Sequence, residues 1–228
     1  MLKHIFIDLD DTILDFSGGE AKALSTTLAS FGLDPTPEIL QLYHVINIRH
    51  WEMLERGELT RPQVLVKRFE ALFAELGLPL SGAEVNKTYG HNLSLQHDFL
   101  PGAKDLLNTL FGKYDLYLAS NGNLATQQRR LTDANLYPWF QGVFISEEIG
   151  ANKPSPEFFE KCFSQIPSFH PEDAVMIGDS LTSDIKGGRD AGLRTIWFNP
   201  HHKAPAADIQ PDFEIESLSQ LPGLLEIL

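Results

Sequence analysis

The most constraining feature of the chain is the segment FIDLDDT at residues 6–12, where an apolar run ends at one aspartate and a second follows two positions later. The run from His4 to Asp8 has the character of a buried strand, and side chains two apart on a strand point to the same side. Asp8 and Asp10 are therefore expected to face one space at the strand's C-terminal end, where open parallel sheets bind ligands. Close carboxylates repel one another unless a cation or a hydrogen bond intervenes, and hard oxygen ligands suit Mg²⁺. Taken alone, this aspartate-rich segment fits a turn or a helix cap equally well.

A second strand is predicted at residues 115–119, and polar groups follow it directly. The strand leads into Ser120, Asn121 and Gly122 before a helix begins. A hydroxyl, an amide and backbone N–H groups at a strand-to-helix junction are suited to binding an anion. This junction is therefore a candidate phosphate site.

A third strand is predicted at residues 174–177, followed by GDSLTSD at residues 178–184. Gly178 lets the backbone approach a ligand closely, and Asp179 and Asp184 lie on the loop and at the start of the next helix. Both carboxylates are expected to reach a metal held by Asp8. Lys153 precedes Pro154 and a helix that Ser155 is expected to cap, although a single lysine before a proline is weak information.

The order of these segments is more specific than any one of them. It resembles the haloacid dehalogenase superfamily of phosphohydrolases, whose motifs correspond here to DLDDT, Ser120, Lys153 and GDSLTSD. The resemblance extends from Ile5 to the segment GGRDAGLRTIWFNP. It implies an α/β fold, with a Rossmann-like, doubly wound parallel sheet and an inserted all-helical cap domain.

The resemblance also implies a phosphatase that works through an aspartyl-phosphate. Asp8 would be the nucleophile, and a carboxylate is competent in this role once Mg²⁺ screens the phosphate charge. Asp10 would be the general acid and then the general base. The implied metal ligands are Asp8, the main-chain carbonyl of Asp10, Asp179 and, in or near the coordination sphere, Asp184. The implied substrate-binding groups are Ser120, Asn121 with the backbone around it, and Lys153.

The chain of 228 residues is expected to divide into two domains. Residues 1–14 and 97–228 show alternating strand and helix patterns and would form the catalytic core. Residues 15–96 show apolar residues at helical spacing, interrupted near Gly32, Gly57 and Gly77, and would form a cap of about four helices. In the family, a cap at this point covers the active site and selects small substrates.

Composition limits the setting and the partners of the protein. The single cysteine, Cys162, excludes an intramolecular disulfide, and no apolar run approaches the ~20 residues of a membrane span. We therefore expect a cytoplasmic protein without membrane contact. A net charge of −13 argues against binding to nucleic-acid polymers, which relies on basic patches. The same charge repels a phosphorylated substrate on average, so local cations must attract it. The oligomeric state stays open.

Longer strings give a closer resemblance, to the bacterial pyrimidine 5'-nucleotidases of this superfamily. They include HVINIRHWEMLERGELT, NGNLATQQRRL and FISEEIGANKPSPEFF. The implied substrate is a nucleoside 5'-monophosphate. Asn47, Arg49, His50 and Trp51 are candidates for substrate contacts, although Trp51, on a helix that also carries Leu54, fits a core position better. Residues 127–130 are expected to form an exposed helix face.

Other functions remain open on the sequence alone. A sugar-phosphate or other small-metabolite phosphatase, or a phosphomutase of the same superfamily, would use the same motifs. Thr12 favours hydrolysis, because the mutases typically have glycine there. A dehalogenase of the superfamily would use its aspartate on carbon and would not need Mg²⁺, and Asp10 in the intact DLDDT argues against it. A phospho-acceptor module of signalling or a catalytically inactive binding protein is the non-enzymatic alternative, and Mg²⁺-dependent turnover would exclude both.

Overall fold

A computed structural model describes residues 2–204 and 208–228 of the chain. The chain divides into two compact units, one formed by Met1–Phe16 and His97–Leu228 and the other by Ser17–Gln96. We call the first the α/β unit and the second the helical unit. The helical unit is inserted after the first strand of the α/β unit.

The α/β unit is built on a parallel sheet. In the part of the chain that the structure describes, six strands form this sheet in the order β3-β2-β1-β4-β5-β6, and every neighbouring pair is parallel. The strands are β1 (His4–Ile7), β2 (Asp115–Ser120), β3 (Gly142–Ile145), β4 (Ala174–Gly178), β5 (Arg194–Phe198) and β6 (Phe213–Ile215). The strand β1 lies between β2 and β4. The predicted parallel α/β fold is confirmed.

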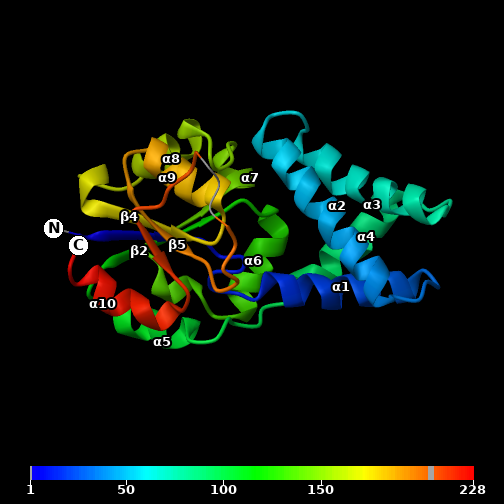
Figure 1. Cartoon of the computed structure of the whole chain (residues 1–228), viewed down its shortest axis with the longest axis horizontal. Coiled ribbons are helices and arrows are strands. Elements are labelled where there is room, and N and C mark those ends of the chain that lie inside the picture. The colour runs from blue at the N-terminus through cyan, green and yellow to red at the C-terminus, as the bar shows by residue number, and fades with distance from the viewer. Residues whose placement is uncertain (1, 205–207) are drawn as a thin grey trace. The chain divides into compact units, whose positions relative to one another are not determined.

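Alternating side chains of β1 pack on opposite faces of the sheet, as the period of two requires. Ile5 and Ile7 belong to a core that includes Leu106 and Leu107 of α5. Phe6 belongs to a second core that includes Phe158 of α8. Helices therefore cover both faces, which explains why Ile5, Phe6 and Ile7 form a continuous apolar run rather than an alternating pattern. In Figure 1, α5 and α10 lie on one side of the sheet and α8 and α9 on the other.

The helices of the α/β unit lie between successive strands, except for the last, which follows β6. They are α5 (Ala103–Leu110), α6 (Leu124–Asp133), α7 (Ser146–Ile149), α8 (Pro156–Phe163), α9 (Gly187–Asp190) and α10 (Leu221–Leu225). Ser155 stands at the N-cap of α8 as predicted, but its side chain makes no capping hydrogen bond. Pro156 at the first helical position fixes the start of this helix instead.

The helical unit consists of α1 (Phe16–Ser30, whose first residue belongs to the α/β unit), α2 (Pro37–Glu55), α3 (Arg61–Leu76) and α4 (Gly82–Ser94). The boundaries follow local signals in the sequence. Thr36 and Ser81 accept hydrogen bonds from the first turns of α2 and α4, and Thr60 forms a capping box with Gln63. Gly77 ends α3 with φ of 65°, a conformation that favours glycine. The predicted helical character of this region is confirmed.

The chain leaves and re-enters the α/β unit at one place. The backbone N–H of Asp15 donates to the carbonyl of Asp98 at 2.9 Å, and Leu14 forms an antiparallel bridge with Phe99. The two backbone segments that lead into and out of the insertion therefore lie side by side, and the first of them continues the loop that carries Asp8 and Asp10.

A buried polar network holds the helical unit together. Asn47 of α2 donates to Glu20 of α1 at 2.6 Å and accepts from Arg68 of α3 at 2.8 Å, while Arg68 also donates to Asn86 of α4 at 2.9 Å. Glu20, Asn47 and Arg68 are each 3 % exposed. The amide of Asn47 thus links two buried charges that lie on different helices. Trp51 packs beside Leu54, as its predicted core position requires.

Within residues 2–204 and 208–228, no helix combines the length and the hydrophobicity needed to cross a membrane.

Replacing Asn47 with alanine tests the role of this network. We expect Asn47→Ala to lower the free energy of unfolding by about 2–3 kcal/mol, because Glu20 and Arg68 would each lose a hydrogen bond while buried. Urea denaturation followed by circular dichroism measures the loss. Gln41→Ala, at an exposed position of the same helix, is the control and should change stability little. Equal stability of the two variants would contradict the role given to Asn47.

Candidate active site

Three adjacent strands bring the predicted residues to one edge of the sheet. Asp8 follows β1, Ser120 ends β2, and Asp179 follows β4, and β1 pairs with both of the others. The backbone N–H of Asp8 donates to the carbonyl of Ile177 at 2.9 Å, so this loop starts in register with β4. Because the strands are parallel, the side chains that follow them lie at the same C-terminal edge.

Lys153 lies at the centre of this edge. Its ammonium group donates to Asp8 Oδ1 at 2.6 Å, to Asp184 Oδ1 at 2.6 Å and to the carbonyl of Ala119 at 2.7 Å. The side chain is 1 % exposed. These contacts use all three N–H groups of the ammonium. Lys153 therefore offsets carboxylate charge, while its N–H groups bond to the protein.

Asn121 fixes the backbone of Lys153. Its amide nitrogen donates to the carbonyl of Lys153 at 2.8 Å, and its amide oxygen accepts from the N–H of Lys153 at 2.9 Å. The Asn121 side chain was predicted to bind substrate, and the structure engages both ends of its amide with the protein. The backbone after Ser120 is the part of this segment that fits the predicted anion contact.

The charges of the site shift one another's protonation. Burial raises the pKa of Asp8 well above its ordinary value; Lys153 opposes this effect, and the carboxylates of Asp184, Asp10 and Asp179 add to it. Burial by itself lowers the pKa of Lys153, but Asp184 and Asp8 reverse this effect and raise that pKa above its ordinary value. The site therefore contains more carboxylate charge than its lysine balances.

Asp179 and Asp184 complete a group of carboxylates with Asp8. One oxygen from each lies within 4.8 Å of the others. Asp184 is in the π-helix η3 (Leu181–Lys186) and accepts from the N–H of Ser180 at 3.1 Å. The buried indole of Trp197 donates to the main-chain carbonyl of Asp179 at 2.9 Å. Trp197 thus helps to place Asp179, a role that its position in GGRDAGLRTIWFNP does not by itself reveal.

This donor set fits a hard divalent cation. Burial and the charge of Asp184 raise the pKa of Asp179 to about 7, and the ammonium of Lys203, 3.5 Å away and largely exposed, only partly opposes them. Carboxylate oxygens are the ligands that Mg²⁺ prefers, and a cation would relieve the repulsion among them. Asp8, Asp179 and Asp184 are the side chains that would hold the ion. The predicted contribution of the Asp10 main-chain carbonyl stays a prediction.

Asp10 is bound by two residues of the helix face that the sequence predicts to be exposed. Arg130 Nη1 donates to Asp10 Oδ1 at 2.5 Å, and Gln127 Nε2 donates to Asp10 Oδ2 at 2.6 Å. Gln127 and Arg130 are 2 % and 1 % exposed, so the prediction of an exposed face at residues 127–130 was wrong for them. It was correct for Gln128 and Arg129, which are exposed. The apolar spacing of Leu124 and Leu131 places Gln127 on the inner face of α6 and was the available signal.

Ser120 shares this contact network. Its hydroxyl oxygen accepts from Gln127 Nε2 at 2.9 Å and from the N–H of Gly122 at 3.1 Å. Because the oxygen accepts in both contacts, the hydroxyl hydrogen can be donated to an anion. A Cβ at Gly122 would collide with the Gln127 side chain, so glycine is needed here for a close approach.

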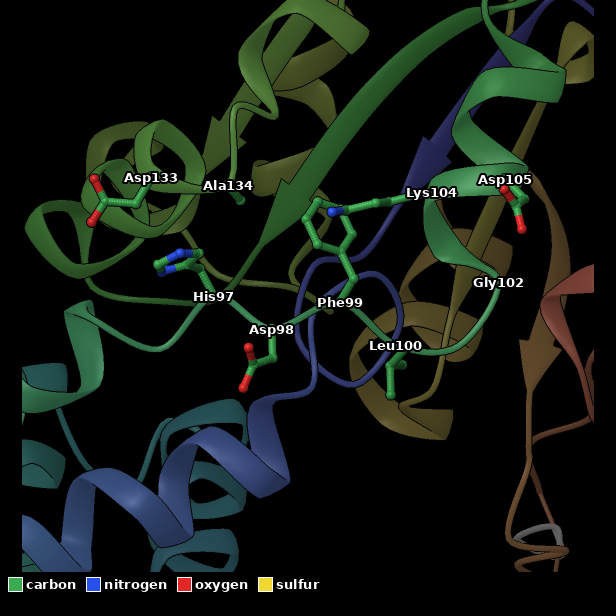
Figure 2. Close-up of a pocket in the computed structure, with 9 residues that line it drawn as sticks. All are labelled: His97, Asp98, Phe99, Leu100, Gly102, Lys104, Asp105, Asp133 and Ala134. Carbon is green, nitrogen blue, oxygen red and sulfur yellow. The ribbon is translucent and has the colours of Figure 1, made fainter.

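A separate pocket of about 490 Å³ lies in the α/β unit, beside the segment at which the chain re-enters it. Figure 2 shows Lys104 reaching over the ring of Phe99 in this pocket, and its ammonium lies 4.4 Å from the ring centroid. The lining residues are His97, Asp98, Phe99, Leu100, Gly102, Lys104, Asp105, Asp133 and Ala134. None of the predicted site residues lines it, so the strand edge remains the candidate active site.

The fold and this edge of carboxylates define a class of hydrolase. A family model described as haloacid dehalogenase-like hydrolase matches residues 2–192, and the chain belongs to this family. The comparisons support an enzyme of the phosphatase class. The sequence interpretation of the family is thereby confirmed.

Close relatives cover nearly the whole chain. The chain is similar to the pyrimidine 5'-nucleotidase PynA of Streptococcus pneumoniae, with 39% identity over 98% of this chain and 95% of the relative. It is also similar to the pyrimidine 5'-nucleotidase YjjG of Escherichia coli, with 32% identity over 97% and 96%. Among solved structures, the magnesium-bound HAD-hydrolase YfnB of Bacillus subtilis matches with a TM-score of 0.94 and 40% identity, covering 98% of each chain.

Substitution of Gly178 tests the packing beneath this site. A Cβ at Gly178 would meet the carboxyl group of Asp184, which Lys153 and Ser180 hold in place. We expect Gly178→Ala to lower the free energy of unfolding by about 1–3 kcal/mol, the cost of overpacking a rigid site. Gly223→Ala on α10, where an added Cβ meets nothing within 4 Å, is the matched control. Chemical denaturation compares them, and an unaltered Gly178→Ala protein would show that Asp184 is free to move.

Proposed function

We propose that the protein is a Mg²⁺-dependent phosphomonoester hydrolase that acts through an aspartyl-phosphate on nucleoside 5'-monophosphates, with a preference for pyrimidines. The observation that carries the reaction type is the position of Asp8, which lies within hydrogen-bonding distance of Lys153 and close to the carboxylates of Asp179 and Asp184. The names of PynA and YjjG support the substrate class.

In the first step of the proposed reaction, a carboxylate oxygen of Asp8 attacks phosphorus while the bond from phosphorus to the leaving oxygen breaks. Asp10 gives its proton to that oxygen, and the nucleoside leaves as an alcohol. The Ser120 hydroxyl and the backbone N–H of Asn121 donate to the non-bridging oxygens of the phosphoryl group that is transferred. Lys153 acts through its charge, because its N–H groups already bond to the protein.

In the second step, water attacks phosphorus and gives a proton to Asp10, now a carboxylate. The bond between phosphorus and Asp8 breaks, so that inorganic phosphate is released and the Asp8 carboxylate returns. Asp10 thereby regains the proton that it gave up in the first step. A bound Mg²⁺ ion would supply positive charge to the phosphate oxygens, which adds to the charge of Lys153.

We further propose that the helical unit acts as a cap that selects small phosphorylated substrates. Support comes from its place in the chain, inserted directly after the loop that carries Asp8 and Asp10. The backbone contact between Asp15 and Asp98 brings both ends of the insertion to this loop. The cytoplasmic location inferred from the sequence belongs to the same proposal.

Metal binding is tested by thermal unfolding with magnesium and with chelator. At a concentration of about 100 Kd, Mg²⁺ should stabilise the protein by about 2.7 kcal/mol. Asp179→Asn should lose most of this gain. Glu226→Gln, at an exposed carboxylate of the same unit, should retain it. A magnesium effect of the same size in all three proteins would contradict the assigned ligands.

The same variant tests the charge balance in chelator. The pKa of Asp179 is about 7 in the folded protein against an ordinary 3.8, so its charge lowers stability progressively as the pH rises from about 4 to about 7. The Asn side chain has no carboxyl group and stays neutral at every pH in this range. Metal-free Asp179→Asn should therefore be more stable than wild type at pH 8 and closer to it at pH 5. Measured unfolding midpoints at both values decide this, and a wild-type advantage at pH 8 would overturn it.

Phosphate release tests the reaction and the substrate. With Mg²⁺, we expect pyrimidine nucleoside 5'-monophosphates to be hydrolysed faster than purine monophosphates or sugar phosphates. Asp8→Asn should reduce turnover by at least ~10³-fold, as removal of a covalent nucleophile does. Asp11→Asn is the control, because it removes a neighbouring carboxylate and Asn tolerates the positive φ of this position.

Each outcome of this assay decides a different part of the proposal. Faster release from sugar phosphates would keep the mechanism and reject the substrate class. Full activity in Asp8→Asn, or in chelator, would reject the mechanism.

A further inference from the structure

Both oxygens of the Asp10 carboxylate are held by one face of α6. Arg130 donates to Oδ1 and Gln127 to Oδ2, at 2.5 and 2.6 Å. The same Arg130 nitrogen donates to Gln127 Oε1 at 2.8 Å, so the two α6 side chains also hold each other. We call Gln127 and Arg130 the α6 clamp. They are three residues apart and therefore adjacent on the helix surface.

The α6 clamp is buried, which distinguishes it from a surface ion pair. Arg130 and Gln127 are almost fully inaccessible, whereas the Asp10 side chain remains 26 % exposed. A buried guanidinium requires a nearby anion, because its desolvation is costly. The ring of Phe16, 5.7 Å from the guanidinium carbon, adds to this enclosure. The clamp thus binds the Asp10 carboxylate from the protein interior, while part of the Asp10 side chain remains exposed to solvent.

The clamp also connects Asp10 to the anion-binding segment. The amide nitrogen of Gln127 has two hydrogens, and its contacts are Asp10 Oδ2 and Ser120 Oγ. Gly122, in the same segment, has no side chain and so leaves space for Gln127. One amide group therefore sets the distance between the carboxyl group of Asp10 and the hydroxyl of Ser120.

We propose that Gln127 and Arg130 are positioning residues for the proton transfers of Asp10. This inference rests on the proposed function, in which Asp10 protonates the leaving oxygen. Proton transfer requires a fixed direction between donor and acceptor, and a carboxyl group on a loop would otherwise rotate. The clamp fixes that direction relative to Ser120, whose hydroxyl orients the phosphate. Neither residue of the clamp touches the substrate in this scheme.

The dependence on the leaving group separates positioning from a general structural effect. A nucleoside leaves as an alcohol and needs a proton, whereas 4-nitrophenolate leaves without one. The ratio kcat/KM covers only the steps up to departure of the leaving group, so water attack does not enter it. We compare kcat/KM for uridine 5'-monophosphate and for 4-nitrophenyl phosphate, both with Mg²⁺.

We expect Arg130→Met to lower kcat/KM for uridine 5'-monophosphate by ~10²-fold, the lower range of general acid catalysis, and to change the value for 4-nitrophenyl phosphate only a few-fold. Gln127→Met should show the same selectivity with a smaller loss. Arg130→Lys should recover part of the loss, because it retains a charge. Arg129→Met and Gln128→Met, the exposed neighbours, are matched controls and should behave as wild type.

Asp10→Asn shows the effect of losing the proton donor itself. It therefore distinguishes failure of the α6 clamp inference from failure of the proposed function. Equal losses on both substrates in Arg130→Met, beside a selective loss in Asp10→Asn, would overturn the clamp alone. Unchanged activity in Arg130→Met and Gln127→Met would overturn it as well. Absence of selectivity in Asp10→Asn, or an inactive wild type, would instead overturn the proposed function. Should Arg130→Met not fold, Gln127→Met and Arg130→Lys decide the question.

Discussion

The buried ammonium group of Lys153 is the interaction on which the active-site edge depends. It joins Asp8 after β1, the carbonyl of Ala119 in β2 and Asp184 after β4, and so connects three adjacent strands through one nitrogen. An ammonium group that lost one of these partners would remain buried and incompletely solvated, which is strongly destabilising. The parallel order β2-β1-β4 is what brings these partners within reach. Asn121, by bonding to the backbone of Lys153, places the lysine without using any of its N–H groups.

Charge balance then explains why the edge favours a cation. Lys153 is shared by Asp8 and Asp184, and Arg130 is bound to Asp10. Asp179 has the exposed ammonium of Lys203 at 3.5 Å, a weaker partner in high dielectric. The raised pKa values of Asp8 and Asp179 have the same origin, since burial removes water from carboxylates that also repel one another. Lys153 and Arg130 nevertheless provide buried positive charge at the place where a phosphate would bind, in a chain with a net charge of −13.

The sequence predicted those features that depend on local patterns. Burial of side chains produces periodic patterns in the sequence, such as the apolar run before Asp8 and the helical spacing of Leu24 and Leu28. The strands and helices therefore lie close to their predicted ranges. Contacts between side chains that are distant in the sequence produce no periodic pattern, so they could not be predicted in this way. Gln127 and Arg130 are polar and were assigned to solvent, although a carboxylate 117 and 120 residues away binds them. Asn121 is a similar case, because its amide is occupied by a residue 32 positions further on.

Two carboxylates on one loop can perform different chemistry only if their surroundings differ. Asp8 is 7 % exposed and bonded to an ammonium that it shares with Asp184, which keeps it in a fixed, enclosed position suited to a nucleophile. Asp10 lies two residues later, more exposed, and is held from α6 by Gln127 and Arg130. The next residue, Asp11, has a positive φ of 54°, which marks a turn in the backbone directly after Asp10. Asp8 and Asp10 thus bond to different cations on different parts of the α/β unit, which allows each to perform a different role.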